Sequence, residues 1–188
     1  MAASGPAPLR NETRPEVRGA RPEDLAAIRR IYAHHVETGL ASFEERAPEP
    51  AEMTRRFQAI QQAGDAYLVA SLDGRIAGYA YAAPYRPRPA YRFVREGSVY
   101  VAPEAQRRGV GSALLDALVE ACTEQGVRRL IAVIGDSDNQ ASIGLHRAHG
   151  FRQAGLLPSV GFKFGRWVDS VIMERPLGEG DSSLPREA

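Results

Sequence analysis

The stretch VYVAPEAQRRGVGSALL, residues 99–115, passes from one structural pattern to another. Val99–Val101 are β-branched or aromatic, as in a strand, and the chain then breaks at Pro103. After Gly109 apolar residues recur every four positions, as in an amphipathic helix. The segment between them, QRRGVG, sets two arginines beside two spaced glycines. A strand, a charged glycine-containing turn and a helix in this order indicate an α/β domain.

The turn at residues 106–111 has the chemistry of an anion site. The first turn of a helix leaves backbone N–H groups without intrahelical partners, and phosphate groups commonly bind there. Gly109 and Gly111 would let a pyrophosphate approach the backbone, and Arg107 and Arg108 would add charged donors. A plain strand-to-helix turn with solvated arginines is the alternative, because the dinucleotide fingerprint and the Walker loop are both incomplete here.

Composition and charge favour one globular domain. Of the 188 residues 44% are hydrophobic and 25% are charged, which is ordinary for such a domain. A net charge of +1 argues against a nucleic-acid or membrane partner, and no apolar run approaches the roughly 20 residues that span a bilayer. Cys122 is the only cysteine, and the N-terminus lacks the apolar centre of a secretory signal, so we expect a cytoplasmic protein.

Strand and helix patterns alternate along the rest of the chain. Helices are expected at 22–38, 48–63 and 109–125, with a short one ending at Gly150. Strands are expected at 17–20, 67–71, 76–82, 97–101, 129–134, 151–156 and 168–174. The order βααβββαβαββ predicts an α/β (α+β) fold with a central mixed, twisted sheet flanked by helices. We expect one domain over residues 16–177, a disordered leader at 1–15 and a flexible C-terminal tail at 178–188.

The turn also resembles the pyrophosphate-binding motif of the GNAT superfamily of N-acetyltransferases. Residues 106–111 fit its pattern Q/R-x-x-G-x-G/A, and the element order is similar to that superfamily's. Downstream, GDSDNQASIGLHRAHGF (135–151) and VGFKFGRWVDSVIMER (160–175) resemble the phosphinothricin and methionine sulfoximine acetyltransferases within it. The resemblance covers about residues 17–177, and GFKFGRW is its most specific block.

The resemblance implies acetyl-CoA as the co-substrate. Its pantetheine arm would add to Val99, Tyr100 and Val101 like an extra strand, although these residues could equally be an ordinary core strand. Its pyrophosphate would contact Arg107, Arg108, Gly109, Val110, Gly111 and Ser112. Asn139 would contact the pantetheine, and capping of the following helix is the alternative role for this residue.

Acetyl transfer from a thioester to an amine needs a group that accepts the amine proton. The resemblance implies that Glu96, just before the V-Y-V strand, is this base and acts through water. A surface glutamate paired with Arg92 or Arg95 is the alternative. His146 is implied to lie near the active site, where it could assist a proton transfer. A structural histidine is the alternative there, and no zinc spacing occurs, so no metal is expected.

The loop at 84–93 and the segment 161–167 are implied to frame the substrate pocket. The residues expected to bind substrate are Arg86, Pro87, Arg88, Glu96, Gly97 and Ser98. Further cations that could bind a substrate carboxylate are Arg92, Lys163 and Arg166. Leu40, Phe43 and Trp167 would line an apolar side of the pocket or a dimer contact, and a core position is equally open for Phe43 and Trp167.

These expectations together describe an N-acetyltransferase. It would move the acetyl group from acetyl-CoA directly to the amine of a small amino acid analogue that also carries a carboxylate, with Glu96 as general base. Phosphinothricin, methionine sulfoximine and methionine sulfone are the expected substrates, which connects the protein with herbicide resistance. The resemblance also suggests a homodimer. Acetylation of protein N-termini and non-catalytic binding of acyl-CoA in a regulatory protein stay open as alternatives.

Overall fold

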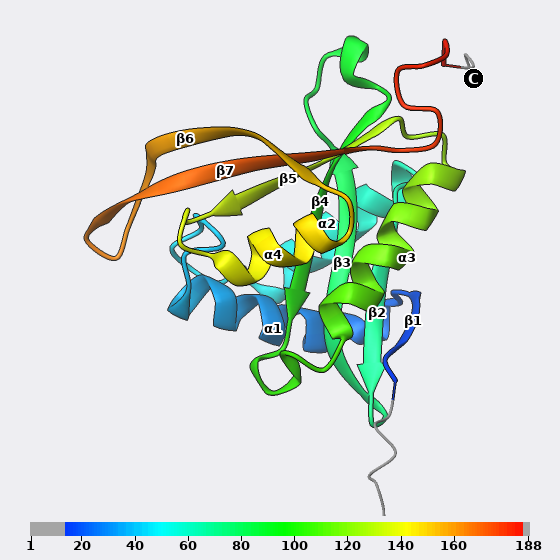
Figure 1. Ribbon diagram of the computed structural model, residues 1–188. Coiled ribbons are helices and arrows are strands. Elements are labelled where there is room, and N and C mark those ends of the chain that lie inside the picture. Colours follow the sequence, from blue (N-terminus) through cyan, green and yellow to red (C-terminus); the bar gives the residue numbers. More distant parts are fainter. Residues whose placement is uncertain (1–13, 186–188) are drawn as a thin grey trace, which may run out of the picture.

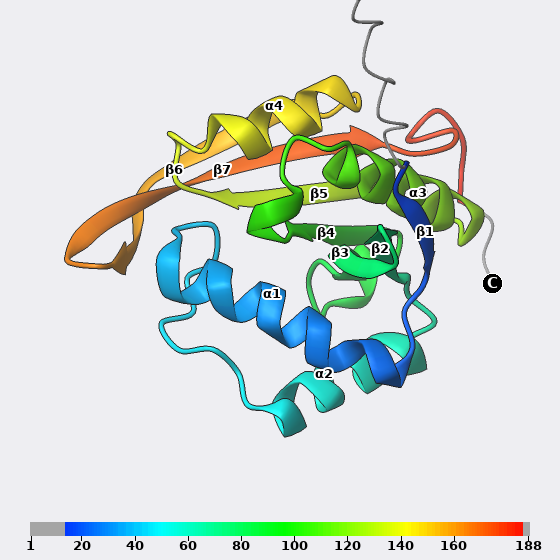
Figure 2. The ribbon, with the colours of Figure 1, turned by 90° about the horizontal axis from the view of Figure 1, so that it is seen from below.

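A seven-stranded mixed sheet forms the centre of the computed structural model, which describes residues 14–185 (Figure 1). The strands are β1 (Glu16–Gly19), β2 (Tyr67–Leu72), β3 (Arg75–Pro84), β4 (Val94–Val101), β5 (Arg129–Gly135), β6 (Arg152–Lys163) and β7 (Arg166–Pro176). The helices are α1 (Leu25–Thr38), α2 (Pro50–Gln62), α3 (Val110–Glu124) and α4 (Gln140–Ala148). Figure 2 shows α3 and α4 on one face of the sheet and α1 and α2 on the other. The predicted order βααβββαβαββ and the single α/β (α+β) domain are confirmed.

The strands lie in the order β1-β2-β3-β4-β5-β7-β6 and are antiparallel except for β4 and β5. This parallel pair is joined over three positions only, Val94–Glu96 against Arg129–Ile131. Beyond Glu96 the two strands separate, and no strand within residues 14–185 pairs with this edge of β4 from residue 97 to 101. The sheet therefore opens at its middle, directly before the strand-turn-helix segment at residues 99–115.

Most strands are longer than their sequence patterns predicted, and for β4 and β6 the added length changes the position of expected site residues. β4 begins at Val94, so Glu96 lies inside the strand and not before it. β6 runs from Arg152 to Lys163, although its sequence pattern predicted an end at residue 156. Its register with β7 shifts twice, and these shifts interrupt the two-residue alternation by which a strand is recognised. The segment predicted to frame a substrate pocket is therefore the tip of a long β6–β7 hairpin, which extends past the helices in Figure 1.

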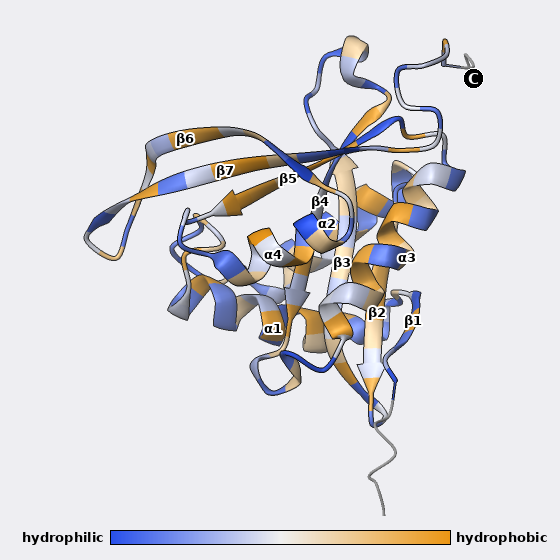
Figure 3. Cartoon of the chain, in the orientation of Figure 1, coloured by the Kyte–Doolittle hydropathy of each residue, from blue (hydrophilic) through white to orange (hydrophobic). Residues whose placement is uncertain are grey.

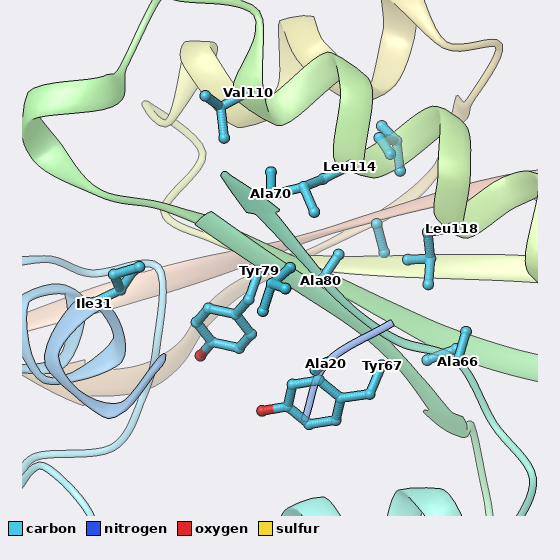
Figure 4. Packing of buried hydrophobic residues seen from close by; sticks show 14 of the residues in the cluster. Ala20, Ile31, Ala66, Tyr67, Ala70, Tyr79, Ala80, Val110, Leu114 and Leu118 are labelled. Carbon is cyan, nitrogen blue, oxygen red and sulfur yellow. The ribbon is translucent and has the colours of Figure 1, made fainter. Parts of the chain in front are cut away.

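Helix α3 is fixed to the sheet by its apolar face. Val110, Leu114 and Leu118 are almost fully buried against the strands (Figure 4). Figure 3 shows the apolar residues of α3 gathered on the side that faces the sheet. Gly78 in β3 permits this close packing, since a Cβ there would lie 2.9 Å from Val110 Cγ1 and 2.9 Å from Tyr100 O. Cys122 is buried on the same face, as predicted for a small hydrophobic residue, and burial raises the pKa of its thiol to about 12.

The ends of the chain are described in part. Residues 1–13 of the predicted leader and 186–188 of the predicted tail lie outside the described residues. Residues 178–185 form turns, and Arg128 Nη2 donates to Ser183 Oγ at 2.8 Å and to Leu184 O at 3.0 Å. Over residues 14–185, no helix has the length and apolar character needed to cross a membrane.

Candidate active site

A cavity of about 650 Å³ lies along the open edge of β4, between the ends of α1, α3 and α4. The predicted cofactor-binding residues that line it are Val99, Tyr100, Val101, Arg107, Gly109, Gly111, Ser112 and Asn139. Arg108 and Val110 lie outside this lining. The side chain of Val110 is buried in the core, and Arg108 Nη2 lies 3.0 Å from Asp73 Oδ2. The structure thus brings most of the predicted cofactor residues to one cavity.

The start of α3 presents backbone donors to this cavity. Gly109 precedes the helix with a φ of +80°, and the N–H of Ala113 makes the first helical hydrogen bond, to Gly109 O at 3.0 Å. The N–H groups of residues 110–112 therefore have no helical acceptor. Arg107 also has a positive φ, of +57°, which an arginine seldom adopts. Such left-handed turns before a helix form concave sites for anions.

The open edge of β4 offers backbone groups at alternate residues only. Ala102 N–H donates to Ala77 O at 2.8 Å, and in an antiparallel pair this bonding side recurs at every second residue. Tyr100 therefore pairs with Tyr79 through its backbone, whereas Val99 and Val101 turn their backbone groups to the open side. This geometry supports the predicted addition of a pantetheine arm, like an extra strand, at Val99 and Val101. Tyr100 can contribute only its side chain.

His35, which was not predicted to have a functional role, also lines the cavity. Its Nε2 donates to Val101 O at 2.8 Å and so satisfies one group of the open edge. Burial lowers the pKa of His35, which keeps its imidazole neutral. Because His35 follows Ile28 and Ile31 at helical spacing, its place on the buried face of α1 was a signal available in the sequence.

Asn139 caps α4, and it also lines the cavity. Its Oδ1 accepts a hydrogen bond from Ser142 N at 3.2 Å and caps α4, while the residue lines the cavity. Gly111 faces α4 as well, since a Cβ there would lie 3.2 Å from Leu145 Cδ2. The glycine therefore serves the close approach of α3 and α4, in addition to leaving the cavity open.

Glu96 occupies the last position at which β4 and β5 are paired. Burial raises the pKa of its carboxyl, and the nearby Arg86 guanidinium partly offsets this shift. A pairing with Arg95 does not occur, because Arg95 Nε donates to Asp65 Oδ1 at 2.5 Å. Glu96 is not among the residues that line the cavity, whose first β4 residue is Val99. A half-buried carboxyl with a raised pKa has the properties of a general base.

The other predicted substrate residues divide between two faces of the sheet. Ser98 shares the face of Glu96, because side chains alternate along a strand. Gly97 faces α3, where a Cβ would lie 3.2 Å from Leu118 Cδ2, so this glycine is required by packing. Arg86, Pro87 and Arg88 lie in the exposed loop after β3, and the Arg86 guanidinium stacks on the Tyr85 ring at 4.9 Å.

His146 lies outside the lining of the cavity. It is 5% exposed, and its Nδ1 donates to Ser142 O at 2.9 Å within its own helix. Its ring packs edge-on against Phe151 with 5.0 Å between centroids, and burial lowers the pKa of the imidazole. This placement fits a structural histidine, which was the alternative to a role near the active site.

Lys163 was expected to bind a substrate carboxylate, and that prediction is wrong. The side chain is buried, and its ammonium donates to Val36 O at 2.7 Å, Gly39 O at 2.9 Å and Ser42 O at 2.7 Å. It therefore fixes the end of α1 and the loop after it, which lines the cavity at residues 39–41. The available sequence signal was that Lys163 is the only lysine of the chain.

The rest of the GFKFGRW block supports the same loop or lies at the surface. The Phe43 ring covers Gly161, where a Cβ would lie 2.6 Å from Phe43 Cε2. Arg166 Nη2 lies 2.8 Å from Asp136 Oδ2, so this cation is paired at the rim of the cavity. Trp167 is 65% exposed, which rules out the core position considered for it.

The sequence of this chain matches the model of a known family over about two thirds of its length. Residues 28–151 match the model of the Acetyltransferase (GNAT) family. The chain belongs to this family. The resemblance inferred from the sequence is thereby confirmed, and the protein is a GNAT acetyltransferase.

Similar proteins are named as acetyltransferases of phosphinothricin or of methionine sulfoximine and methionine sulfone. It is 58% identical over 169 residues to phosphinothricin N-acetyltransferase of Alcaligenes faecalis, which is 90% of this chain and 86% of that protein. It is 40% identical over 162 residues to L-methionine sulfoximine/L-methionine sulfone acetyltransferase of Pseudomonas paraeruginosa, 86% of this chain and 94% of that protein. A crystal structure of phosphinothricin acetyltransferase from Sinorhizobium meliloti in complex with acetyl-CoA superposes with a TM-score of 0.90, at 47% identity, covering 93% of this chain and 94% of that one.

Metal ligands are not grouped in the GNAT acetyltransferase. Over the described range 14–185, no three His, Cys, Asp or Glu side chains stand together so that they could hold a metal ion.

Proposed function

We propose that this GNAT enzyme transfers the acetyl group of acetyl-CoA directly to the α-amine of a small amino acid analogue of the phosphinothricin or methionine sulfone type. The observation that carries the proposal is the position of Glu96, at the last paired position of β4 and β5 and three residues before Val99, where β4 first lines the cavity. The names of the relatives support the choice of acceptor.

The residues of the cavity fit acetyl-CoA. The backbone donors at the start of α3 and the Arg107 guanidinium suit a pyrophosphate. The open backbone groups of Val99 and Val101, with Asn139 opposite, suit the amide-containing pantetheine arm. When bound, acetyl-CoA supplies the activated acetyl group, and the protein positions it.

The proposed chemistry assigns the proton to Glu96. The neutral amine nitrogen attacks the thioester carbonyl carbon, a C–N bond forms, the C–S bond breaks, and coenzyme A leaves as a thiolate that takes a proton from water. The Glu96 carboxylate takes the proton that the amine loses, through a water molecule. Arg86 and Arg88 are proposed to bind the acceptor's carboxylate, which arginine can do with two parallel hydrogen bonds. His146 has no part in this mechanism, because its position suits a structural role.

The proposal predicts thiol release that depends on a small amine. The purified protein with acetyl-CoA is expected to turn over phosphinothricin, methionine sulfoximine or methionine sulfone well above its rate of acetyl-CoA hydrolysis. A peptide with a free N-terminus is the control, and faster turnover of the peptide would favour a protein N-terminal acetyltransferase. Calorimetric binding of acetyl-CoA without any amine-dependent turnover would favour a non-catalytic acyl-CoA-binding protein.

A homodimer is proposed on the β6–β7 hairpin. This hairpin exposes several large apolar side chains together, and clusters of this kind mark protein interfaces. They are Leu156, Leu157, Val160, Phe162, Phe164 and Trp167. A second copy of the chain would cover them.

Sedimentation velocity tests this dimer. The wild-type protein is expected to sediment as a dimer, and a Leu157→Glu/Phe162→Glu variant as a monomer, because buried carboxylates without partners are costly. Leu184→Glu is the matched control, since Leu184 is 91% exposed and lies outside the hairpin. A monomeric wild type, or a dimer that survives the double substitution, would contradict this interface.

The proposed activity has two further consequences. Acetylation of phosphinothricin would give resistance to that herbicide, because an acylated amine is neutral and no longer presents the amino acid's charge. A cytoplasmic location is proposed as well, and it agrees with a buried free thiol at Cys122.

A further inference from the structure

A second cavity, of about 260 Å³, lies between the sheet and α2. Aromatic rings from the sheet and α1 form one side, and side chains of α2 form the other. Its main lining residues are Tyr32, Tyr67, Tyr79, Tyr81, Met53 and Arg56. None of the roles assigned so far uses this cavity.

Two phenol hydroxyls open into the cavity without a protein partner. Tyr79 is 1% exposed and Tyr67 is 7% exposed, and over residues 14–185 neither hydroxyl has a hydrogen-bonding side chain or backbone group in reach. Neither oxygen is fully enclosed, so the cavity is where each can be solvated. Figure 4 shows both oxygens on the same side of the sheet, away from α3. Buried hydroxyls left without partners are costly, so these two are available to a ligand.

The hydroxyls are donors under ordinary conditions. Burial raises the pKa of Tyr67 and of Tyr79, so both phenols stay protonated. The Arg56 guanidinium stands at the same cavity, where it bonds to Glu44 and to Glu52 at 2.7 Å each. The cavity therefore combines apolar walls with O–H donors, which suits an apolar stem that ends in oxygen acceptors.

Glu96 lies outside the lining of this cavity but close to it in the register of the strands. Tyr81 lines it and pairs across the strands with Ser98, which lies two residues after Glu96 on the same face. Two residues along a strand span about 7 Å. Tyr81 therefore lies about 7 Å along the sheet from Glu96, and Tyr79, which pairs with Tyr100, lies about twice as far. An amino acid whose amine is near Glu96 would extend its side chain toward Tyr81 and the phenols beyond it. Glu96 and Arg56 both influence the pKa of the Tyr81 phenol electrostatically.

We propose that this phenol-lined cavity binds the side chain of the acceptor amino acid and selects a tetrahedral oxo group, such as a sulfone, a sulfoximine or a phosphinate. Tyr67 and Tyr79 donate hydrogen bonds to its oxygens, and the rings pack against its stem. This inference rests on the proposed function and names the part of the site that sets its substrate class.

Phenylalanine substitutions test the inference, because they remove the hydroxyl and keep the ring. The Tyr67→Phe/Tyr79→Phe variant is expected to lose about tenfold in kcat/KM for methionine sulfone, the cost of about two hydrogen bonds. Methionine, which has the same stem without oxygens, is the control substrate, and its kcat/KM is expected to stay within twofold. Thermal unfolding of the variant checks that the fold is kept.

A second pair of variants tests occupancy of the cavity. Ala59 is exposed and lines the cavity, so Ala59→Trp would obstruct it and is expected to raise KM for the sulfone at least fivefold. Gln58→Trp, at the neighbouring exposed position outside the lining, is expected to leave KM unchanged.

The outcomes separate this inference from the proposed function. If the wild-type enzyme acetylates no amino acid analogue, the proposed function fails and the inference fails with it. If the wild-type enzyme is active but the double phenylalanine variant keeps the wild-type ratio of sulfone to methionine, the inference alone is overturned. An equal fall for both substrates would also overturn it, because the hydroxyls would then not recognise the oxo group.

Discussion

Glu96→Gln is expected to lower kcat/KM for the acceptor amine by about 10²- to 10⁴-fold at neutral pH, the usual contribution of a general base. Glutamine keeps the size and the hydrogen-bonding oxygen of glutamate but cannot accept the proton. Steady-state thiol release at saturating acetyl-CoA measures the effect. Glu120→Gln, at an exposed position of α3, is the matched control and should keep wild-type activity.

The pH profile identifies the role of Glu96 more sharply than the rate alone. Because burial raises the pKa of the Glu96 carboxyl, wild-type activity should fall as the pH drops through a value above the ordinary carboxyl range. Glu96→Gln should lack this limb, so the two rates approach each other in acid. The same acid limb in the variant would remove Glu96 from the role of base.

Stability provides the complementary measurement for Glu96. A carboxyl whose pKa is raised by folding stabilises the protein when the pH is below its pKa in the unfolded chain. This stabilisation is lost as the pH rises through its pKa in the folded protein. Near neutral pH the ionised carboxylate therefore gives no stability that glutamine would lose. The unfolding midpoint of Glu96→Gln at pH 7 should be equal to or above that of the wild type, which separates lost chemistry from lost folding.

Lys163→Met is expected to lower the free energy of unfolding by about 2–4 kcal/mol, since the substitution leaves the buried carbonyls of Val36, Gly39 and Ser42 without their shared donor. The loop they belong to lines the cofactor cavity at residues 39–41, so KM for acetyl-CoA should rise as well. Thermal unfolding and initial rates at varied acetyl-CoA measure the two effects.

Lys163→Arg is the informative companion variant. It keeps the charge but replaces a compact ammonium by a planar guanidinium, which cannot point at three converging carbonyls in the same way. We expect it to be less stable than the wild type and more stable than Lys163→Met. A Lys163→Met protein with the wild-type unfolding midpoint and KM would contradict the positioning role.

The element order could be predicted because local signals agree with one another. Asp73-Gly74 forms the expected tight hairpin between β2 and β3, and the four-residue apolar spacing of α3 matches its buried face. The strand ends were less predictable. β6 contains Pro158 and Gly161, and its bulges break the alternation on which strand recognition depends.

Which residues form the site depends on backbone conformation and long-range contacts, which the sequence pattern alone does not contain. Arg107 and Arg108 are neighbours with the same chemistry, and the positive φ of Arg107 decides which one lines the cavity. Lys163 contacts carbonyls more than 120 positions earlier in the chain, which no local spacing reveals. The face that Tyr67 and Tyr79 share follows from the register of β2 with β3, which the sequence does not specify residue by residue.

The tripod of carbonyls around Lys163 has a chemical consequence for an enzyme that holds an acetyl thioester. Every other long basic side chain of the protein is an arginine, whose guanidinium stays charged and is a poor nucleophile. The one ε-amine is buried, with all three of its N–H bonds engaged. Apart from the N-terminal amine, the chain therefore has no free amine that its bound acetyl-CoA could acetylate. Self-acetylation does not compete with the amine that enters from solution.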